Sequence, residues 1–281
     1  MTQPLNTPKP SLLAIFAHPD DEAFSSGGTL AHYASLGVEV NLVCSTRGEA
    51  GKITDPNLTI DDLGRHREHE LREACKTLGI NEPIFLGYRD SGRLERLRKD
   101  DPLASINADP REIEAKVREA VERLQPQVML SFDPHGGYDH PDHIVIHQAA
   151  LAAFFSSGHF PNPPQRLFYT ASPLEVMKTW VNMPGGPMTP GMTAEVYGVS
   201  EETIAFKHDV SKYVEQKRAA IRLHGSQTGP TSRIGQMPAE YLEKMRERQK
   251  TENFSLGGTR GPIVNWPLRG FFDGLGFEGL L

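Results

Sequence analysis

Short apolar segments alternate with helix-like segments along most of the chain, and this alternation limits the fold more than any other feature. Residues 12–17 and 38–44 are apolar runs of buried-strand length, and a helix-like stretch over 26–36 separates them. This order is typical of a βαβ unit, in which the two strands run parallel. The alternation continues with expected strands at 84–86, 128–132, 166–170 and 203–206 and expected helices at 61–78, 110–124, 143–155 and 172–181.

Repeated βαβ units predict an α/β protein with a Rossmann-like three-layer fold, in which helices cover both faces of a mostly parallel sheet. The 281 residues, 38% of them hydrophobic, can bury a large core. Because no internal repeat or low-complexity linker marks a boundary, we expect one domain over 1–281. Two segments break the rhythm: Pro and Gly predict a long surface loop over 182–198, and the Gly- and aromatic-rich tail 257–281 can dock on the body or on another subunit.

Composition narrows the class of partner. The formal net charge is -6 and no long basic run occurs, so we expect a small-molecule partner and no nucleic acid. The first residues lack a signal-peptide pattern, and no stretch of about 18 apolar residues predicts membrane insertion. Cys44 and Cys75 form no CxxC pair, which favours a reducing, cytoplasmic location. The sequence leaves open whether the chain is a monomer or a homo-oligomer.

An imidazole and three carboxylates crowd together where the first expected strand ends. His18, Asp20, Asp21 and Glu22 fall within five residues, at the kind of strand end where open parallel sheets bind ligands. Adjacent carboxylates repel one another unless a cation or shared protons compensate. Catalytic zinc takes three protein ligands and keeps one position open, so one ligand is missing here. The plainer alternative is a solvated acidic turn.

A second polar cluster, residues 133–143, follows the expected strand at 128–132 and should lie on the same rim of the sheet. His140 and His143 flank a proline, and the residues after them suit a helix, so His143 can project from a helix start toward a metal. Asp139 and Asp142 offer acceptors that orient an imidazole. The alternative is a polar loop with incidental histidines, and the presence of the first cluster weighs against it.

Two motifs, AHPDDE at 17–22 and GYDHPDH at 137–143, resemble segments of the PIG-L/LmbE family of zinc-dependent N-acetylglucosaminyl deacetylases, which includes mycothiol- and bacillithiol-type enzymes. The resemblance extends over most of the chain. Further similar segments follow in the expected order at 45–51, 65–68, 86–92 and, less diagnostically, 222–227.

By this resemblance His18, Asp21 and His143 are the metal ligands, and Asp20 is the general base. Zinc is the implied cofactor, although a His, Asp and His set also accepts Fe²⁺ or Mn²⁺. The division of roles is chemically sensible, because adjacent carboxylates in a turn point different ways. One can bind the cation while the other accepts a proton from metal-activated water.

The resemblance assigns three further catalytic residues. Tyr138 matches a tyrosine that stabilises the tetrahedral oxyanion. His140, held by Asp142 as an imidazolium, would stabilise charge and protonate the departing amine. Glu22 is expected to support the backbone or orient the ligands rather than to touch substrate.

Substrate binding is assigned by resemblance to Glu49, Arg67 and Asp90. Carboxylates and guanidinium groups suit sugar hydroxyls and anionic groups. The alternative for each is an exposed charge of a loop or helix, since surface charges are abundant.

The sequence thus predicts a metal-dependent hydrolase that removes the acetyl group from an N-acetylglucosamine derivative, and the resemblance connects it with low-molecular-weight thiol biosynthesis. An amidase that cleaves thiol S-conjugates would share every core residue named above. A sugar- or nucleotide-binding Rossmann-like protein without hydrolysis would need neither Asp20 nor Tyr138 beside the metal ligands.

Overall fold

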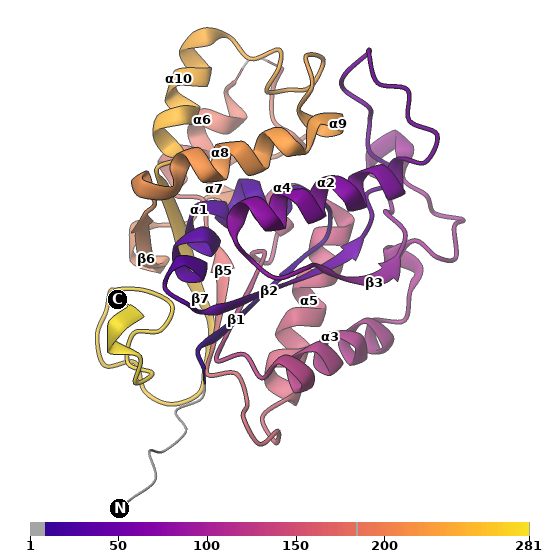
Figure 1. The fold of residues 1–281 in the computed structure, drawn as a ribbon. Coiled ribbons are helices and arrows are strands. Elements are labelled where there is room, and N and C mark those ends of the chain that lie inside the picture. The colour runs from indigo at the N-terminus through magenta and orange to yellow at the C-terminus, as the bar shows by residue number, and fades with distance from the viewer. Residues whose placement is uncertain (1–8, 184, 281) are drawn as a thin grey trace, which may run out of the picture.

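A seven-stranded sheet runs through the computed structural model, which describes residues 9–183 and 185–280 (Figure 1). The strand order is β3-β2-β1-β4-β5-β7-β6, and the first five strands of this order are parallel. Strand β7 runs antiparallel to both β5 and β6, so the predicted mostly parallel sheet is confirmed. The strands are β1 (Ser11–Phe16), β2 (Glu39–Thr46), β3 (Ile84–Tyr88), β4 (Val128–Ser131), β5 (Arg166–Thr170), β6 (Ile204–Asp209) and β7 (Thr251–Thr259).

Helices cover both faces of the sheet, which confirms the three-layer prediction. Helices α1, α2 and α8 pack against one another on one face, and α3 and α5 pack together on the other (Figure 1). The helices are α1 (Asp21–Ser35), α2 (Leu63–Leu78), α3 (Pro110–Leu124), α4 (Gly136–Asp139), α5 (Pro141–Ser156), α6 (Leu174–Val181), α7 (Ala194–Tyr197), α8 (Val214–Leu223), α9 (Gly225–Thr228) and α10 (Ala239–Arg248).

Local signals fix the bounds of α3, which agree with the predicted 110–124. The Asp109 side chain accepts a hydrogen bond from the backbone of the first turn, and Pro110 opens that turn, where a missing N–H costs nothing. The buried residues recur every three or four positions and form one apolar stripe: Ile113, Val117, Ala120 and Val121.

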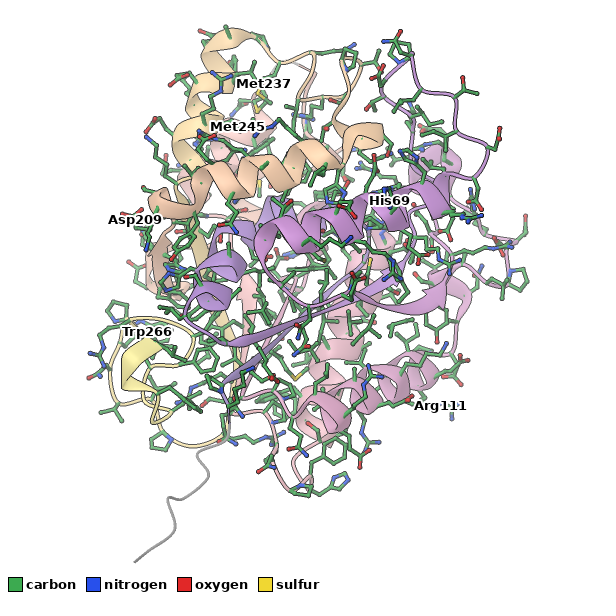
Figure 2. The ribbon with its side chains drawn as sticks, in the orientation of Figure 1. His69, Arg111, Asp209, Met237, Met245 and Trp266 are labelled. Atoms are coloured by element: carbon green, nitrogen blue, oxygen red, sulfur yellow. The ribbon has the colours of Figure 1, made fainter. Side chains whose placement is uncertain are left out.

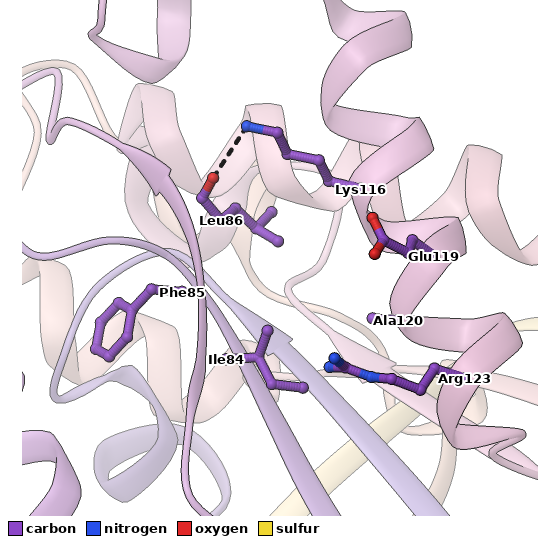
Figure 3. Close-up of a pocket in the computed structure, with 7 residues that line it drawn as sticks. All are labelled: Ile84, Phe85, Leu86, Lys116, Glu119, Ala120 and Arg123. Carbon is purple, nitrogen blue, oxygen red and sulfur yellow. Dashed lines mark hydrogen bonds between the residues drawn. The ribbon is translucent and has the colours of Figure 1, made fainter.

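Charged side chains cover the sheet edge formed by β3. An open edge strand invites pairing with another chain. The Lys116 ammonium of α3 donates a hydrogen bond to the Leu86 carbonyl of β3 at 3.0 Å, across a groove that Glu119 and Arg123 also line (Figure 3). Lysine on an edge is a common protection against unwanted strand pairing.

The structure corrects the predicted tail 257–281, because its first residues belong to strand β7. A Cβ on Gly257 would lie 2.4 Å from the Tyr169 ring, and one on Gly258 would lie 2.7 Å from the Phe154 ring. Glycine is therefore required where aromatic rings of β5 and α5 approach the strand closely. These two glycines conceal the apolar alternation that identifies a strand.

Beyond Thr259 the tail docks on the body of the same chain. The Phe271 ring stacks on Tyr33 of α1 with a centroid separation of 5.4 Å, and its backbone N–H donates to the Tyr33 hydroxyl at 2.8 Å. Phe271 and Phe272 are fully buried, whereas Trp266 is 51% exposed (Figure 2). Of the two docking partners considered for this tail, the body of the protein is the one observed.

The strand order reverses between β1 and β4, and this reversal positions the functional site. The chain passes from β1 outward through β2 to β3, whereas β4 begins the other half of the sheet. Open α/β sheets bind ligands at such a reversal, beyond the carboxyl ends of the strands. Strands β1 and β4 pair directly, with Leu13 opposite Met129, so the polar clusters that follow them meet on one rim.

Among the described residues, each helix is too short or insufficiently apolar to cross a membrane. The expectation about a signal peptide falls on residues 1–8, which lie outside the described residues. The cytoplasmic location and the single domain over 1–281 stay predictions.

Two neighbouring glycines of α1 should respond differently to alanine. A Cβ on Gly28 would lie 2.6 Å from the Val210 Cβ, whereas one on Gly27 would lie 3.3 Å from the Lys217 Cγ. Overpacking should make Gly28→Ala less stable by about 1 to 3 kcal/mol. Gly27→Ala should be near neutral, because alanine also favours the helix. Urea unfolding of both variants checks this, and equal losses would contradict it.

His208 should make the protein less stable in acid. Burial and the neighbouring His32 lower the pKa of His208 to about 4, although Glu252 and Asp209 oppose this. An unfolded histidine titrates near about 6.5, so the unfolded chain binds the extra proton between these values and stability falls as the pH falls. The side chain is partly exposed, which reduces the effect. Between pH 7 and pH 4 we expect the free energy of unfolding of the parent to fall by about 1 to 2 kcal/mol more than that of His208→Gln. Urea unfolding at both pH values measures this, and an equal loss of unfolding free energy in the two proteins would contradict it.

Candidate active site

The three predicted metal ligands converge at the rim of the sheet. His18 follows β1, Asp21 opens α1, and His143 lies in the first turn of α5. The His18 Nδ1 atom lies 3.1 Å from the His143 Nε2 atom and 3.6 Å from Asp21 Oδ2. The His143 Nε2 atom lies 3.4 Å from Asp21 Oδ1. All three side chains are buried.

In both histidines, the ring nitrogen that faces away from the other histidine contacts a hydrogen-bond acceptor. His143 Nδ1 lies 3.0 Å from the Gly136 carbonyl oxygen, and His18 Nε2 lies 3.0 Å from Asp142 Oδ2. Both partners are acceptors, so these ring nitrogens carry the protons. The inner nitrogens, His18 Nδ1 and His143 Nε2, face each other and the Asp21 carboxylate. A divalent cation fits this donor set, since metal-bound histidines commonly donate their other N–H to such acceptors.

The pKa values of these three residues also favour a cation at the site. Burial lowers the pKa of His143 to about 4, so this imidazole is neutral. Burial alone would raise the pKa of Asp21, but His143 and His18 lower it below its usual value. Burial alone would lower the pKa of His18, yet Asp90, Asp142 and Asp21 raise it well above its usual value. The carboxylates therefore favour positive charge at His18, which a bound metal ion would supply in place of the ring proton.

Other donors lie close enough to offer different ligand sets. The ring nitrogens of His18, His140 and His143 lie within 4.8 Å of one another, as do donor atoms of His18, Asp90, His140 and Asp142. The second set is less suited to a metal, because both Asp142 oxygens accept hydrogen bonds from Ser91 N–H, at 2.9 Å, and from the Ser105 hydroxyl. The ligand set His18, Asp21 and His143 stays a proposal.

The structure corrects two expectations about His140. Asp142 contacts His18 rather than His140, because Ser91 and Ser105 hold its carboxylate on the far side of the His18 ring. The His140 ring instead caps α5, and its Nδ1 atom accepts the Asp142 backbone N–H at 3.3 Å. Burial, with smaller effects of His18 and other neighbours, lowers the pKa of His140 far below its usual value. Burial thus opposes the expected imidazolium, and the catalytic role of His140 stays a prediction.

Asp20 lies beside this donor cluster in a strained backbone conformation. Its φ is 121°, a value that residues other than glycine rarely adopt. Its carboxylate lies 3.1 Å from the Arg67 guanidinium, and its side chain is 19% exposed. Burial raises the pKa of Asp20 to about 6, although Arg67 opposes this. The carboxyl group can therefore exchange a proton near neutral pH.

Tyr138 is held by the segment 182–198, which was predicted as a surface loop. The Arg93 guanidinium lies 5.2 Å from the centroid of the Tyr138 ring and donates to Thr189 Oγ1 at 3.2 Å. The Thr189 hydroxyl in turn donates to the Tyr138 carbonyl. Part of the segment is buried, including Met192, and α7 forms within it, so the surface-loop prediction is wrong there. Arg93 and Arg233 supply donors for its carbonyls, which lets irregular backbone pack inward.

A cavity of about 460 Å³ opens from this rim. Asp20, Asp21, Tyr138 and His143 line its inner end. Its outer wall comes from α6, the segment 182–198 and α10, on which Figure 2 labels Met245. This wall is largely apolar, with Arg233 and Arg248 among its polar residues. Burial raises the pKa of Tyr138, so its hydroxyl keeps its proton as a donor. Prominent wall residues are Met177, Trp180, Val181, Met188, Met192 and Met245.

The cavity lining does not include the predicted substrate residues Glu49, Arg67 and Asp90. Arg67 donates to the Gly48 and Pro19 carbonyls, and Asp90 accepts the backbone N–H groups of Ala50 and Gly92. Glu49 accepts the Asp90 N–H at 3.0 Å. In this structure the three side chains support the loops of the site, and their contact with substrate stays a prediction.

Sequence reasoning missed two features of the site. The apolar cavity wall comes from separate segments that carry no common motif. His224 lies in the segment 222–227, whose weak resemblance was noted, but no role for it was inferred. Its Nε2 atom lies 2.7 Å from Glu22, whose other oxygen accepts the Asp20 N–H at 3.0 Å. The expected supporting role of Glu22 is thereby confirmed.

Comparisons with known proteins identify the family. The PIG-L profile, described as GlcNAc-PI de-N-acetylase, matches residues 13–154. A 1D-myo-inositol 2-acetamido-2-deoxy-alpha-D-glucopyranoside deacetylase of Salinispora arenicola is 34% identical over 279 residues, which cover 93% of this chain and 90% of that protein. The chain belongs to the PIG-L family. The part matched by the PIG-L profile includes all proposed metal ligands and Asp20, whereas α6 and α10 lie beyond it.

Solved structures share the fold at lower identity. The N,N'-diacetylchitobiose deacetylase of Pyrococcus horikoshii matches with a TM-score of 0.59 and 22% identity, over 89% of this PIG-L chain and 85% of that chain. GalB, the 4-carboxy-2-hydroxymuconate hydratase of Pseudomonas putida, matches with a TM-score of 0.58 and 18% identity, over 91% and 99%. Because a hydratase shares the fold, the fold alone does not specify deacetylation.

Removing a proposed ligand should remove the metal. We expect His143→Ala to bind Zn²⁺ at least about 100-fold more weakly than the parent, and Asp142→Asn to weaken binding by about 10- to 100-fold through His18. The matched control is His135→Ala, in the same loop but with a side chain 46% exposed, which should bind as the parent does. Competition with a chromogenic chelator measures all three affinities. Parental affinity in His143→Ala would remove this residue from the ligand set.

Proposed function

We propose that this chain is a metal-dependent N-deacetylase that removes the acetyl group from an N-acetylglucosaminyl compound. One observation carries the proposal: the Asp20 carboxyl group, with a pKa raised to about 6, shares the inner end of a cavity with the buried donors of Asp21 and His143. A binding protein has no need of a proton acceptor beside an open metal site. The deacetylase named in Salinispora arenicola, similar over 93% of this chain, supports the same reaction.

Zinc is the proposed metal, held by His18, Asp21 and His143. Two neutral imidazoles and a carboxylate suit Zn²⁺, and Fe²⁺ or Mn²⁺ fit the same set less selectively. When bound, the metal supplies a Lewis acid that polarises the amide carbonyl and activates water. The chain's own residues direct the protons and the substrate.

Asp20 accepts the proton of the attacking water and returns it to the departing amine. A carboxyl group with a pKa of about 6 can do both near neutral pH. His140 is neutral, and its Nδ1 atom accepts a backbone N–H, so its Nε2 atom carries the proton. It therefore stabilises developing negative charge as a hydrogen-bond donor, and the Tyr138 hydroxyl donates into the same cavity.

The apolar outer wall favours a second candidate, the amidase that cleaves thiol S-conjugates. Methionine and tryptophan side chains suit an apolar substituent better than they suit a polyol. Both candidates use the same inner residues, so only substrate preference separates them.

Neutralising the proposed base should stop turnover without removing the metal. We expect Asp20→Asn to lower kcat by about 100- to 10,000-fold, the usual contribution of general acid–base catalysis, with parental zinc content. Asp209→Asn, a change of the same type at an exposed carboxylate on β6, is the control and should keep parental kcat. Single-turnover amine release measures the loss. Full activity in Asp20→Asn would exclude Asp20 as the base.

A substrate panel should identify the class of amide that is cleaved. The panel contains N-acetylglucosamine, its inositol glycoside, N,N'-diacetylchitobiose and thiol S-conjugates with apolar substituents. For a deacetylase, kcat/KM should be highest on an N-acetylglucosaminyl glycoside. A preference for the S-conjugates would favour the amidase. Zinc-loaded protein that releases no amine from any member would favour the non-catalytic alternative.

A further inference from the structure

A buried ion pair lies beneath Asp20 and joins two distant parts of the chain. His224 directly follows α8, and Glu22 lies in the first turn of α1. The His224 Nε2 atom lies 2.7 Å from Glu22 Oε1, and the two side chains are 0% and 1% exposed. Neither side chain lines the cavity, so neither touches a substrate there.

The pair acts on the backbone of Asp20. The second carboxylate oxygen of Glu22 accepts the Asp20 N–H at 3.0 Å. One oxygen of Glu22 thus contacts His224 while the other holds Asp20. A charge-assisted bond of this kind is stronger and more directional than a bond between neutral groups.

Asp20 needs such restraint because its backbone is strained. At a φ of 121° the conformation persists only if the surroundings determine it. The Asp20 carbonyl accepts the N–H groups of Ala23 and Phe24, both at 3.1 Å, and Arg67 holds the carboxylate. Within the described part of the chain, Glu22 is the partner of the remaining group, the Asp20 N–H.

One nitrogen of the His224 ring is left without a partner, which a purely structural role does not explain. Its Nδ1 atom is buried and has no hydrogen-bond partner among the described residues. An unpaired buried polar atom is costly and is uncommon unless the residue serves a function. The nearby Ser226, by contrast, has both its N–H and its hydroxyl bonded to Glu70 of α2, which suits a purely structural residue.

We propose that Glu22 and His224 are positioning residues, which hold the backbone of Asp20 so that its carboxyl group faces the cavity beside Asp21 and His143. This inference rests on the proposed function, in which Asp20 accepts the proton of water. Without His224, the Glu22 carboxylate would be buried without its partner and would turn or draw in water. The Asp20 backbone would then relax, and the carboxyl group would leave its position.

The test compares His224→Leu, which gives Glu22 no donor, with His224→Gln, which keeps an N–H donor. We expect His224→Leu to lower kcat at least about 10-fold with parental KM and zinc content, and His224→Gln to recover much of the loss. Ser226→Ala is the structural control, expected to lower the melting temperature and leave kcat unchanged. Circular dichroism verifies folding. If His224→Leu does not fold, the test is the remaining partial loss of kcat in His224→Gln, which should occur with parental KM and zinc content and should disappear in the Asp20→Asn background.

A double-mutant cycle separates positioning from a general structural role. If His224 acts through Asp20, His224→Leu should cause no further loss in the Asp20→Asn background, measured by single turnover at high enzyme concentration. Equal fold losses in both backgrounds would overturn the proposal, as would parental kcat in both His224 variants while Asp20→Asn is inactive. Full activity in Asp20→Asn is a different outcome, because it removes the base from the proposed function itself.

Discussion

The direct pairing of β1 with β4 is the constraint on which the rest of the site depends. It brings the ends of two strands that are more than a hundred residues apart in the chain to neighbouring positions on one rim. His18 and Asp21 follow one strand, and His143 follows the other. Their donor atoms lie within 3.1 to 3.6 Å of one another, an arrangement that favours a cation among them. The sheet supplies the rigidity that keeps these groups together.

Much of the surrounding polar structure keeps these groups in their reactive form. Asp142 fixes the His18 tautomer, and Ser91 and Ser105 fix Asp142. Arg67 holds the carboxylate of Asp20, and Glu22 holds its backbone N–H. Each contact buries a polar or charged group that would be costly without its partner. These hydrogen bonds hold the site together, although two buried atoms beside it, Arg67 Nε and His224 Nδ1, have no hydrogen-bond partner among the described residues.

Sequence reasoning succeeded where a local pattern carries the information. Helix α3 and strand β5 have their predicted bounds, because the cap at Asp109 and the apolar runs act over a few residues. Sequence reasoning failed where contacts between residues far apart in the chain determine the structure. Strand β7 was missed because Gly257 and Gly258 are glycines for the sake of the aromatic rings packed over them. The pairing of Asp142 with His140 was wrong because two serines outside both motifs turn the carboxylate toward His18.

The sequence by itself determined the layered α/β fold and the family, since strand and helix periods and the two motifs are local in the chain. The tertiary structure decided what each motif residue contacts. It assigned Asp142 to His18, left His140 neutral by burial, and brought α6, α10 and the segment 182–198 over the cavity. The physical reason is that protonation and orientation depend on burial and on partners from the whole chain, which no local spacing encodes.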